Sequence, residues 1–310
     1  MDFIQRMRLF QRAAETHSFS AVARELDTTQ PTVSKQIALL EHELDTKLFL
    51  RTNAGLRLTD AGQQFYERAR GLLEELASLR ATLGREPGQP VGRLRVACPT
   101  SFGQAFIAPL LLDLVERHPA LGVEFLLSDR WFDVAEEGID VSIRIGPLPD
   151  ARVVAHKLGA SSQVCVASPA YLKANGEPKH ARDLAQHRCL VNVFLSPDDR
   201  WSFSGPDGPC TVQVQGNFRT NNIETIRTAV LAGNGVAVGA MWLYYDDIAS
   251  GRVKPILRSF VPAPLDIYAL HAPGVRQPAK VTELVKLLAR RIPLIKELGV
   301  PPRPRRSPRT

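Results

Sequence analysis

One stretch in the first third of the chain constrains the fold more than any other. Between residues 65 and 83 apolar side chains recur at alternating spacings of four and three: Phe65, Ala69, Leu72, Leu76, Leu79 and Leu83. This heptad spacing predicts a helix with one apolar seam, and ~24 residues at 1.5 Å rise make it about 36 Å long. The remaining faces are polar, so the seam has to be covered by a second copy of the chain or by the chain's own core.

Both ends of this helix are marked in the sequence. Thr59 is a typical N-cap, Gly84 is a typical stop, and residues 84–92 read GREPGQPVG, a run of Gly and Pro that breaks regular structure. We therefore expect a first domain at 1–59, a linker and dimerisation helix with a hinge at 60–91, and a second domain from residue 92. Because the hinge separates the seam from the second domain, pairing between two chains is favoured over packing within one.

The segment before the seam has the pattern of a winged helix-turn-helix. Asp2 caps a first amphipathic helix, Ser20 a second over 21–26, and Thr29 a third whose inward residues are Val33, Ile37, Leu40 and Leu44. Two short helices joined by a tight turn are typical of helix-turn-helix DNA-binding domains. Residues 47–50 and 56–58 then alternate like two strands around a turn-rich loop, which predicts the wing.

The outward arc of the third helix suits contact with DNA. Small polar residues and one cation allow a helix to approach the floor of the major groove, and an arginine in a wing suits phosphate or the minor groove. The candidate DNA-binding residues are Thr29, Gln30, Pro31, Thr32, Ser34, Lys35, Arg51 and Arg57. Any one of these cations alone is an ordinary surface charge, so the prediction depends on the set.

Net charge adds little to this prediction. The chain carries +7 over 310 residues, but its first 62 residues hold eight basic and eight acidic side chains. The last ten residues, PPRPRRSPRT, hold four arginines and no acid, and we expect this basic tail at 301–310 to be disordered. The pattern of the N-terminal segment, and not the overall basicity, therefore predicts DNA binding.

The part after the hinge alternates strand-like and helix-like stretches, which predicts an α/β fold with largely parallel sheets. Cys98, Cys165, Cys189 and Cys210 are scattered, so the sequence predicts no metal site, no disulfide framework and no cofactor. The N-terminus leads directly into a charged amphipathic helix, and no apolar run approaches a membrane span. We expect a cytoplasmic protein with no membrane partner.

The run SFSAVARELDTTQPTVSKQIALLEHELDTKLFLRTNAGLRLTDAG resembles the N-terminal domain of LysR-type transcriptional regulators. The resemblance is carried by the start of the third helix, by Leu48 and Phe49 with Arg51, and by the motif from Leu58 to Gly62. It implies a homodimer or homotetramer that binds double-stranded DNA at an interrupted palindromic operator. It also implies that Gln30, Thr32, Ser34, Lys35 and Arg51 approach the DNA.

One residue departs from the family pattern. Position 35 is usually Arg in these regulators and is Lys here. A lysine cannot form the two-pronged contact that arginine makes with guanine, so we expect Lys35 to position the protein more than to read sequence.

Residues 92–300 look like the family's effector domain, which is similar to periplasmic binding proteins. Such a domain has two α/β lobes joined by two crossing strands, which we place near 164–166 and 267–269. Lobe I then spans 92–164 and 269–300, and lobe II spans 165–268. Ligands of such sheets bind between the lobes, at the carboxyl ends of strands.

Those strand ends supply the candidate effector-binding residues: Thr100, Ser101, Phe102, Ser128, Arg144, Phe194 and Thr220. Hydroxyls before a helix, with a cation on a later strand, predict a small anionic or strongly polar effector held through Thr100, Ser101 and Arg144. An aromatic small molecule is the other class of effector considered. The alternatives are structural: the hydroxyls merely cap a helix, or Arg144 pairs with an acid such as Asp140.

The predicted function is a sequence-specific DNA-binding transcription regulator whose activity a small molecule modulates. The main alternative is an architectural DNA-binding protein whose second domain only oligomerises. An enzyme is the remote alternative, because the sequence has no GxSxG, HExxH or P-loop motif.

Overall fold

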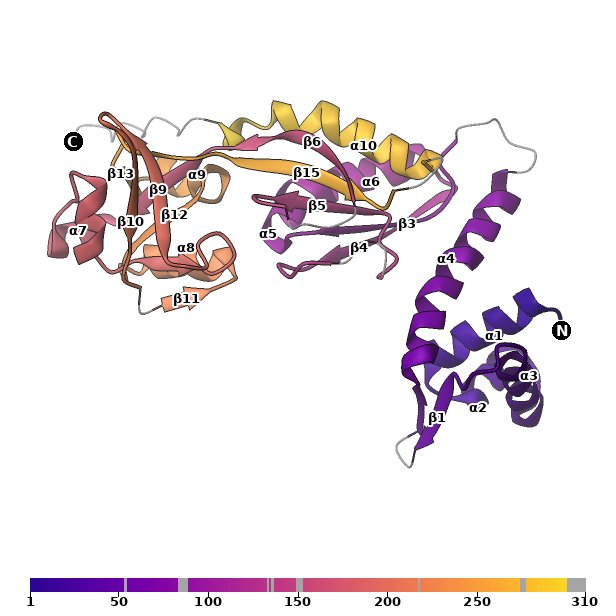
Figure 1. The fold of residues 1–310 in the computed structure, drawn as a ribbon. Helices are drawn as coiled ribbons and strands as arrows, with labels where there is room; N and C mark the ends of the chain where they lie inside the picture. The colour runs from indigo at the N-terminus through magenta and orange to yellow at the C-terminus, as the bar shows by residue number, and fades with distance from the viewer. Residues whose placement is uncertain are drawn as a thin grey trace.

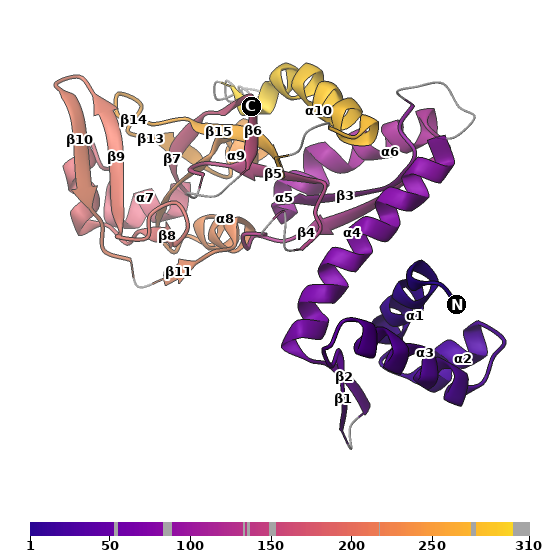
Figure 2. The same cartoon turned by 45° about the vertical axis from the view of Figure 1, so that its right-hand side comes forward.

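The computed structural model describes residues 1–52, 55–82, 89–132, 134, 137–148, 153–216, 218–273 and 277–299. Figure 1 shows an N-terminal domain, a long helix α4 that leaves it, and two lobes beyond. In Figure 2, turned by 45°, helices α1 to α3 lie on the side of α4 away from the second lobe. The basic tail expected at 301–310 lies outside the described residues.

The N-terminal domain begins with α1 (Phe3–Thr16), α2 (Phe19–Glu25) and α3 (Gln30–Glu43). Asp2 caps α1 and Thr29 caps α3, as the sequence predicts. The cap of α2 is a correction, because Ser18 and not Ser20 accepts the hydrogen bond from the Ala21 amide, at 3.2 Å. The helix starts earlier because Phe19 packs edge-on against Phe49 in the core, with 5.4 Å between the ring centroids.

Aromatic side chains hold this domain together. The Phe10 ring of α1 lies 5.1 Å from Phe49 and 5.2 Å from Phe65, so one side chain joins α1 to the wing and to α4. Val33 and Ile37 of α3 are buried in the same cluster. The opposite face of α3 is consequently left open to solvent.

The wing consists of β1 (Phe49–Thr52) and β2 (Gly55–Leu58), paired antiparallel with Leu50 opposite Arg57. Its first strand begins two residues later than the sequence predicts. The reason is a hydrogen-bonded turn before it: the buried Glu41 carboxylate of α3 accepts from the Leu48 amide at 2.9 Å and from the Phe49 amide at 3.2 Å.

Helix α4 (Asp60–Thr82) is joined tightly to the wing. The Thr59 hydroxyl donates to the Lys47 carbonyl at 2.7 Å and accepts from the Gly62 amide at 2.8 Å. A Cβ atom at Gly62 would lie 2.0 Å from the Leu48 carbonyl oxygen, so only glycine fits here. This close approach explains the Thr59 and Gly62 positions of the motif found in the sequence.

The heptad seam of α4 divides into two parts. Ala69 is buried with Met7 of α1, and Phe65 packs on Phe10, so the expectation that these two face a second chain is corrected: the N-terminal domain is small and uses them for its own core. Leu72 is 58% exposed and Leu76 is half-buried. The side chains of Leu79 and Leu83 lie outside the described residues.

The first lobe contains a five-stranded sheet in the order β4-β3-β5-β15-β6. Its strands are β3 (Gly92–Cys98), β4 (Leu121–Leu127), β5 (Val141–Ile145), β6 (Val154–Ser161) and β15 (Leu265–His271). The segment after β3 forms α5 (Thr100–Phe102), a π-helical turn (Gly103–Ile107) and α6 (Ala108–Arg117). Helices α6 and α10 (Ala279–Arg291) pack against this sheet, as Figure 1 shows for α10.

The second lobe is built from shorter elements. Its strands are β7 (Gln163–Ala167), β8 (Leu190–Asn192), β9 (Arg200–Gly205), β10 (Gly208–Gln213), β11 (Phe218–Thr220), β12 (Val236–Ala240), β13 (Lys254–Ile256) and β14 (Val261–Pro262). Its helices are α7 (Pro169–Asn175), α8 (Ile223–Leu231) and α9 (Met241–Ala249). A short 3-10 turn covers Ala181–Gln186 in this lobe, and two more, Ile292–Leu294 and Lys296–Leu298, follow α10.

The sheets are mixed, so the expectation of largely parallel sheets is wrong. Strand β3 is parallel to β4 and β5, but β15 is antiparallel to β5 and β6, and β7 is antiparallel to β12 and β13. The cause is topological: β15 returns from the second lobe and therefore runs against the outgoing strand β6.

The chain crosses between the lobes slightly earlier than the sequence predicts. It leaves the first sheet after Ser161, enters the second lobe at Gln163, and rejoins the first sheet at Leu265. The predicted crossings were 164–166 and 267–269. No helix in the described part of the chain is long and apolar enough to cross a membrane.

Candidate DNA-binding and effector-binding sites

The solvent face of α3 carries most of the predicted DNA-binding residues. Thr29, Gln30, Pro31, Thr32 and Lys35 are exposed, Ser34 is half-buried, and Arg57 of the wing is exposed. The side chain of Arg51 lies outside the described residues. The structure thus brings a polar helix face and a wing cation to the end of the molecule away from the second lobe (Figure 2), an arrangement suited to a helix in the major groove.

Two details sharpen the chemistry of this face. The Thr29 and Thr32 hydroxyls lie 2.8 Å apart and share a hydrogen bond, which orients Thr32 at the start of the helix. Lys35 forms no ion pair with any acid in the described part of the chain. An exposed, unpaired ammonium is free to contact phosphate.

Sequence analysis missed Glu41, which fixes the wing relative to α3. It is 8% exposed, and its carboxylate accepts from the Lys47 ammonium at 2.6 Å as well as from two wing amides. An acid on the apolar side of a predicted helix was the available signal, because such a residue is buried only when it is paired.

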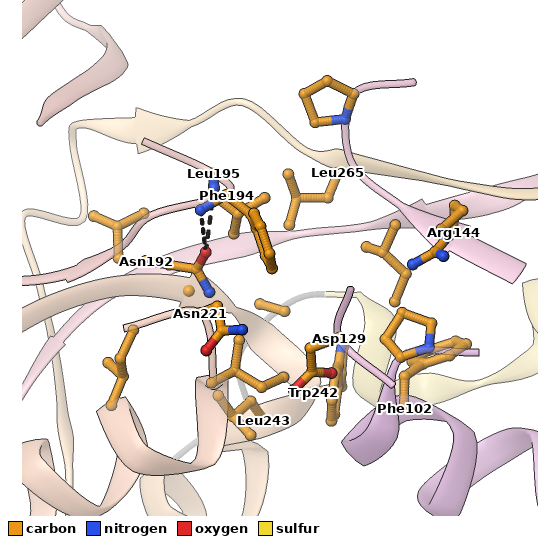
Figure 3. A pocket seen from close by; sticks show the side chains of 18 of the residues that line it. Phe102, Asp129, Arg144, Asn192, Phe194, Leu195, Asn221, Trp242, Leu243 and Leu265 are labelled. Carbon is orange, nitrogen blue, oxygen red and sulfur yellow. Dashed lines mark hydrogen bonds between the residues drawn. The ribbon is translucent and has the colours of Figure 1, made fainter. Parts of the chain in front are cut away.

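The effector candidate is a cavity of about 430 Å³ between the two lobes. The first lobe lines it from the end of β3, the end of β5 and the segment after β4, and the second lobe from β8, α8, β12 and α9. Its walls are mainly apolar and include the rings of Phe102, Trp131, Phe194 and Trp242. Figure 3 shows Arg144 and Phe102 on one side, facing Asn192, Phe194 and Asn221 on the other.

Arg144 is the cation of this cavity. It is only 7% exposed, and its Nε and Nη2 atoms are shielded from water without a hydrogen-bond partner among the described residues. The Trp131 ring covers the guanidinium at 4.8 Å from its centroid, and Figure 3 shows the group directed toward the cavity. Burial lowers the pKa of Arg144, but an arginine stays protonated in proteins.

The expected alternative for Arg144, an ion pair with Asp140, is not formed. Asp140 instead accepts from the Lys280 ammonium at 2.7 Å and from the Arg95 amide at 2.8 Å. Arg144 therefore forms no ion pair with an acid in the described part of the chain, although Asp129 and Glu137 are close enough to act on its charge, and a buried cation without an ion pair is a candidate to bind a ligand.

Asp129 links the two lobes at the cavity. One of its oxygens accepts from the Thr100 amide at 3.0 Å, and the other accepts from the Asn222 side-chain amide at 3.2 Å. Asn222 caps α8 of the second lobe. Asp129 is thus a fixed negative charge in the cavity wall.

Two further residues that line the cavity carry buried, unpaired polar atoms. Trp242 Nε1 and the Tyr244 hydroxyl are buried without a hydrogen-bond partner among the described residues, and burial raises the pKa of Tyr244. The Asn192 carbonyl oxygen accepts from the Phe194 and Leu195 amides, and its amide nitrogen points toward the cavity (Figure 3).

The structure divides the predicted effector residues. Phe102, Arg144 and Phe194 line the cavity, and Thr100, Ser101, Ser128 and Thr220 are not among its lining residues. These four have structural roles or environments: Ser101 is buried, the Ser128 hydroxyl accepts from the Arg130 amide, and the Thr220 hydroxyl accepts from the Asn222 amide. Thr100 contributes its backbone amide to Asp129, and its hydroxyl does not cap the short helix α5.

Several cavity residues escaped sequence analysis. Asp129 directly follows the strand end at Ser128, so the rule that singled out Ser128 could have found it. Trp242 lies on α9, a helix that the sequence pattern did not predict. Asn192 and Asn221 follow very short strands whose ends the pattern does not define.

The cysteines add no site. All four are free thiols, and burial raises the pKa of Cys98, Cys165 and Cys189, which makes these thiols unreactive. Within the described ranges no three His, Cys, Asp or Glu side chains are grouped so as to hold a metal ion.

Together, a helix-turn-helix with an exposed recognition face and a two-lobed domain with a cavity define a ligand-responsive DNA-binding regulator. Residues 4–63 match the family model described as bacterial regulatory helix-turn-helix protein, lysR family, and residues 87–293 match the LysR substrate binding domain. The chain belongs to the family of LysR-type transcriptional regulators. Effector binding by the second domain is typical of this family.

Individual relatives agree over nearly the whole chain. The transcriptional regulator DmlR of Escherichia coli is 32% identical over 283 residues, covering 91% of this chain and 92% of that protein. The transcriptional activator AaeR of the same species is 31% identical and covers 93% of each. The full-length structure of the Vibrio cholerae virulence activator AphB superposes with a TM-score of 0.59 at 27% identity, covering 93% of this chain and 98% of that one.

Proposed function

We propose that this regulator binds an interrupted palindromic operator as a homodimer or homotetramer, and that an anionic small molecule in the interlobe cavity controls it. The observation that carries the proposal is Arg144: a buried cation, stacked under Trp131, with two nitrogen atoms unpaired at a cavity wall. Leaving buried donors unpaired costs free energy, and an anion seated there removes that cost.

On the DNA side the proposal assigns contacts to the exposed residues of α3 and to the wing. Thr29, Gln30, Pro31, Thr32, Ser34 and Lys35 would face the major groove, and Arg51 and Arg57 the flanking backbone or minor groove. A palindrome is proposed because one recognition helix reads only one half-site, so high affinity needs two copies.

The part of α4 beyond the first domain would join those copies. Leu72 is 58% exposed on an otherwise polar helix, and Leu76, Leu79 and Leu83 continue its seam. A charge at this exposed position leaves the monomer's core intact but is unfavourable between two helices. Leu72→Glu should therefore shift the protein toward monomer in analytical ultracentrifugation and lower operator affinity, whereas Leu294→Glu, at another exposed leucine in the segment after α10, should change neither.

The proposal keeps the division into a DNA-binding domain at 1–59, a linker at 60–91 and an effector domain at 92–300, with the lobe crossings moved to the observed strand ends. It places the protein in the cytoplasm with the DNA, and it includes no catalysis. Helix α4 also touches the effector domain, because the Arg70 guanidinium donates to the Glu137 carbonyl at 2.6 Å.

The decisive experiment couples the two ends of the molecule. An operator is selected from random DNA with the full-length protein, and small molecules are then screened for a shift in melting temperature and for a change in operator affinity. We expect at least one anionic compound to produce both effects, and Arg144→Gln to abolish both without changing ligand-free operator affinity. Operator binding that no compound and no cavity variant alters would favour the architectural alternative.

A further inference from the structure

We propose that the effector is an aromatic monocarboxylate, and that Asp129 rejects ligands with a second anionic group. This inference rests on the proposed function, since it names the chemical class of ligand for the same cavity. Three observations carry it: the geometry of the unpaired edge of Arg144 formed by Nε and Nη2, the presence of one cation and one anion in the cavity wall, and the aromatic rings that line the cavity from both lobes.

The free edge of Arg144 has the geometry that grips a carboxylate elsewhere in this chain. Arg227 uses Nε and Nη2 to hold the two oxygens of Asp247, at 2.6 and 3.1 Å. Arg12 uses the same two atoms on Glu25, each at 2.9 Å. In Arg144 these two atoms have no partner but are shielded from solvent by their neighbours, the Trp131 ring among them, so a carboxylate would form two parallel hydrogen bonds with this edge after a local rearrangement of the wall.

The charged residues that line the cavity accommodate only one carboxylate of a ligand. Among the described lining residues Arg144 is the one cation and Asp129 the one anion. The Asp129 carboxylate is held by the Thr100 amide and the Asn222 side chain, so it cannot turn away from an incoming charge. A dianion would place its second carboxylate against apolar walls or beside Asp129, and both are unfavourable.

The body of the ligand follows from the remaining walls. Phe102 and Trp131 face the cavity from the first lobe, and Phe194 from the second. Phe194 is 54% exposed, so a ring bound in the cavity would bury apolar surface on both lobes at once. The Asn192 amide, opposite Arg144 in Figure 3, can donate to a neutral polar substituent at the far end of such a ligand.

The test is calorimetric titration of the full-length protein with benzoate, its neutral isostere benzamide, the dianion terephthalate, and succinate. We expect benzoate to bind best and each of the others to bind at least about tenfold more weakly, because a charge-assisted pair is lost or a like charge is added. Arg144→Lys should weaken benzoate about tenfold, because lysine lacks the two-pronged edge. Arg117→Gln is the control: Arg117 is exposed on α6, pairs with Asp113 and does not line the cavity, so benzoate affinity should not change.

Asp129→Asn tests the exclusion of dianions. Asparagine keeps an oxygen for the Thr100 amide but loses the acceptor for the Asn222 side chain, so a normal melting temperature is required to verify the fold. Terephthalate affinity should rise about tenfold relative to benzoate. If the wild type bound terephthalate or succinate more tightly than benzoate, the proposal that the effector is a monoanion would be wrong. If it bound benzamide as tightly as benzoate, the proposal that the effector is a carboxylate would be wrong.

Different results would exclude the aromatic monocarboxylate and the proposed function. If none of the four probes binds while Arg144→Gln still abolishes a response to another screened compound, the aromatic monocarboxylate is wrong and the proposed function stands. If no cavity variant and no compound affects operator binding, the proposed function itself is lost.

Discussion

Two charged side chains are buried to nearly the same extent at opposite ends of this molecule. Glu41 in the DNA-binding domain is 8% exposed and Arg144 in the effector domain is 7% exposed. The Glu41 carboxylate accepts three hydrogen bonds, from Lys47, Leu48 and Phe49. The Nε and Nη2 atoms of Arg144 have no partner among the described residues.

The difference separates a structural charge from a binding charge. A buried ion whose partners are all supplied by the chain holds two elements together, here α3 and the wing. A buried ion that is held by packing but has no hydrogen-bond partner contributes little to the stability of the fold. At a cavity wall such an ion is a candidate to bind a ligand. Burial alone therefore does not distinguish the two roles, whereas the state of the hydrogen bonds does.

The largest effect is expected from removing the satisfied charge. Glu41→Ala leaves the Lys47 ammonium and two wing amides without their acceptor, and should lower the free energy of unfolding by about 3 kcal/mol. Chemical denaturation of the full-length protein measures this value. Glu43→Ala, two residues further along α3 and on its exposed side, is the control, because its ion pair with Arg6 lies nearer the surface and should contribute about 1 kcal/mol or less. A cost at Glu41 no larger than at Glu43 would contradict its structural role.

Lys35 represents a third kind of charge, exposed and unpaired. If it contacts a phosphate, Lys35→Ala should weaken operator binding and reduce the slope of log affinity against log salt concentration by about one. Arg144→Gln should leave that slope unchanged. Fluorescence anisotropy over a range of salt concentrations distinguishes the two variants, and an unaltered slope for Lys35→Ala would remove this residue from the DNA contact.

A smaller effect is expected at Thr32. The shared hydrogen bond between the Thr29 and Thr32 hydroxyls orients Thr32 for a base edge. Thr32→Ala should reduce discrimination between operator variants by roughly 1 kcal/mol, about fivefold. Competition binding with single-base operator variants measures it, with Thr28→Ala outside the helix as control. Loss of affinity that is uniform across all variants would instead indicate a backbone contact or a damaged helix start.

The smallest effect is expected from removing the unsatisfied charge in the ligand-free protein. Arg144→Gln loses the contact with Trp131, but it also relieves two buried donors, so the free energy of unfolding should change by less than about 1 kcal/mol. The measurement is the same denaturation experiment used for Glu41. A destabilisation as large as that of Glu41→Ala would show that Arg144 supports the fold. Arg144 could then not be distinguished from Glu41 as a ligand-binding charge.

The sequence anticipates the DNA-binding domain better than the cavity, for a physical reason. The faces of α3 follow from the helical repeat within fourteen residues, so Val33 inward and Lys35 outward need no knowledge of the rest of the chain. The cap at Ser18 was missed because Phe19 is drawn into the helix by packing on Phe49, a contact between distant residues.

The cavity draws on segments far apart in the chain, and local patterns say little about which side chains meet. Arg144 and Phe194 were found because they lie in or directly follow strands that the sequence pattern predicts. Trp242 was missed because α9 is apolar on most of its faces, so its sequence lacks the helical repeat of apolar and polar residues. Thr100 fitted the local rule for an anion site, but the structure assigns its amide to Asp129. The same limitation affected the seam of α4, where Phe65 and Ala69 turned out to pack on α1.

The contact between α4 and the effector domain has a thermodynamic consequence. The Glu137 carbonyl accepts from Arg70 of α4 and from Arg95 of β3, and it lies eight residues after Asp129 in the segment that borders the cavity. If occupancy of the cavity alters operator affinity through this segment, then by reciprocity operator DNA alters effector affinity by the same factor. The concentration of effector that half-saturates the protein would then differ between molecules on their operator and molecules free in solution, so the threshold of the response is a property of the protein–DNA complex and not of the cavity alone.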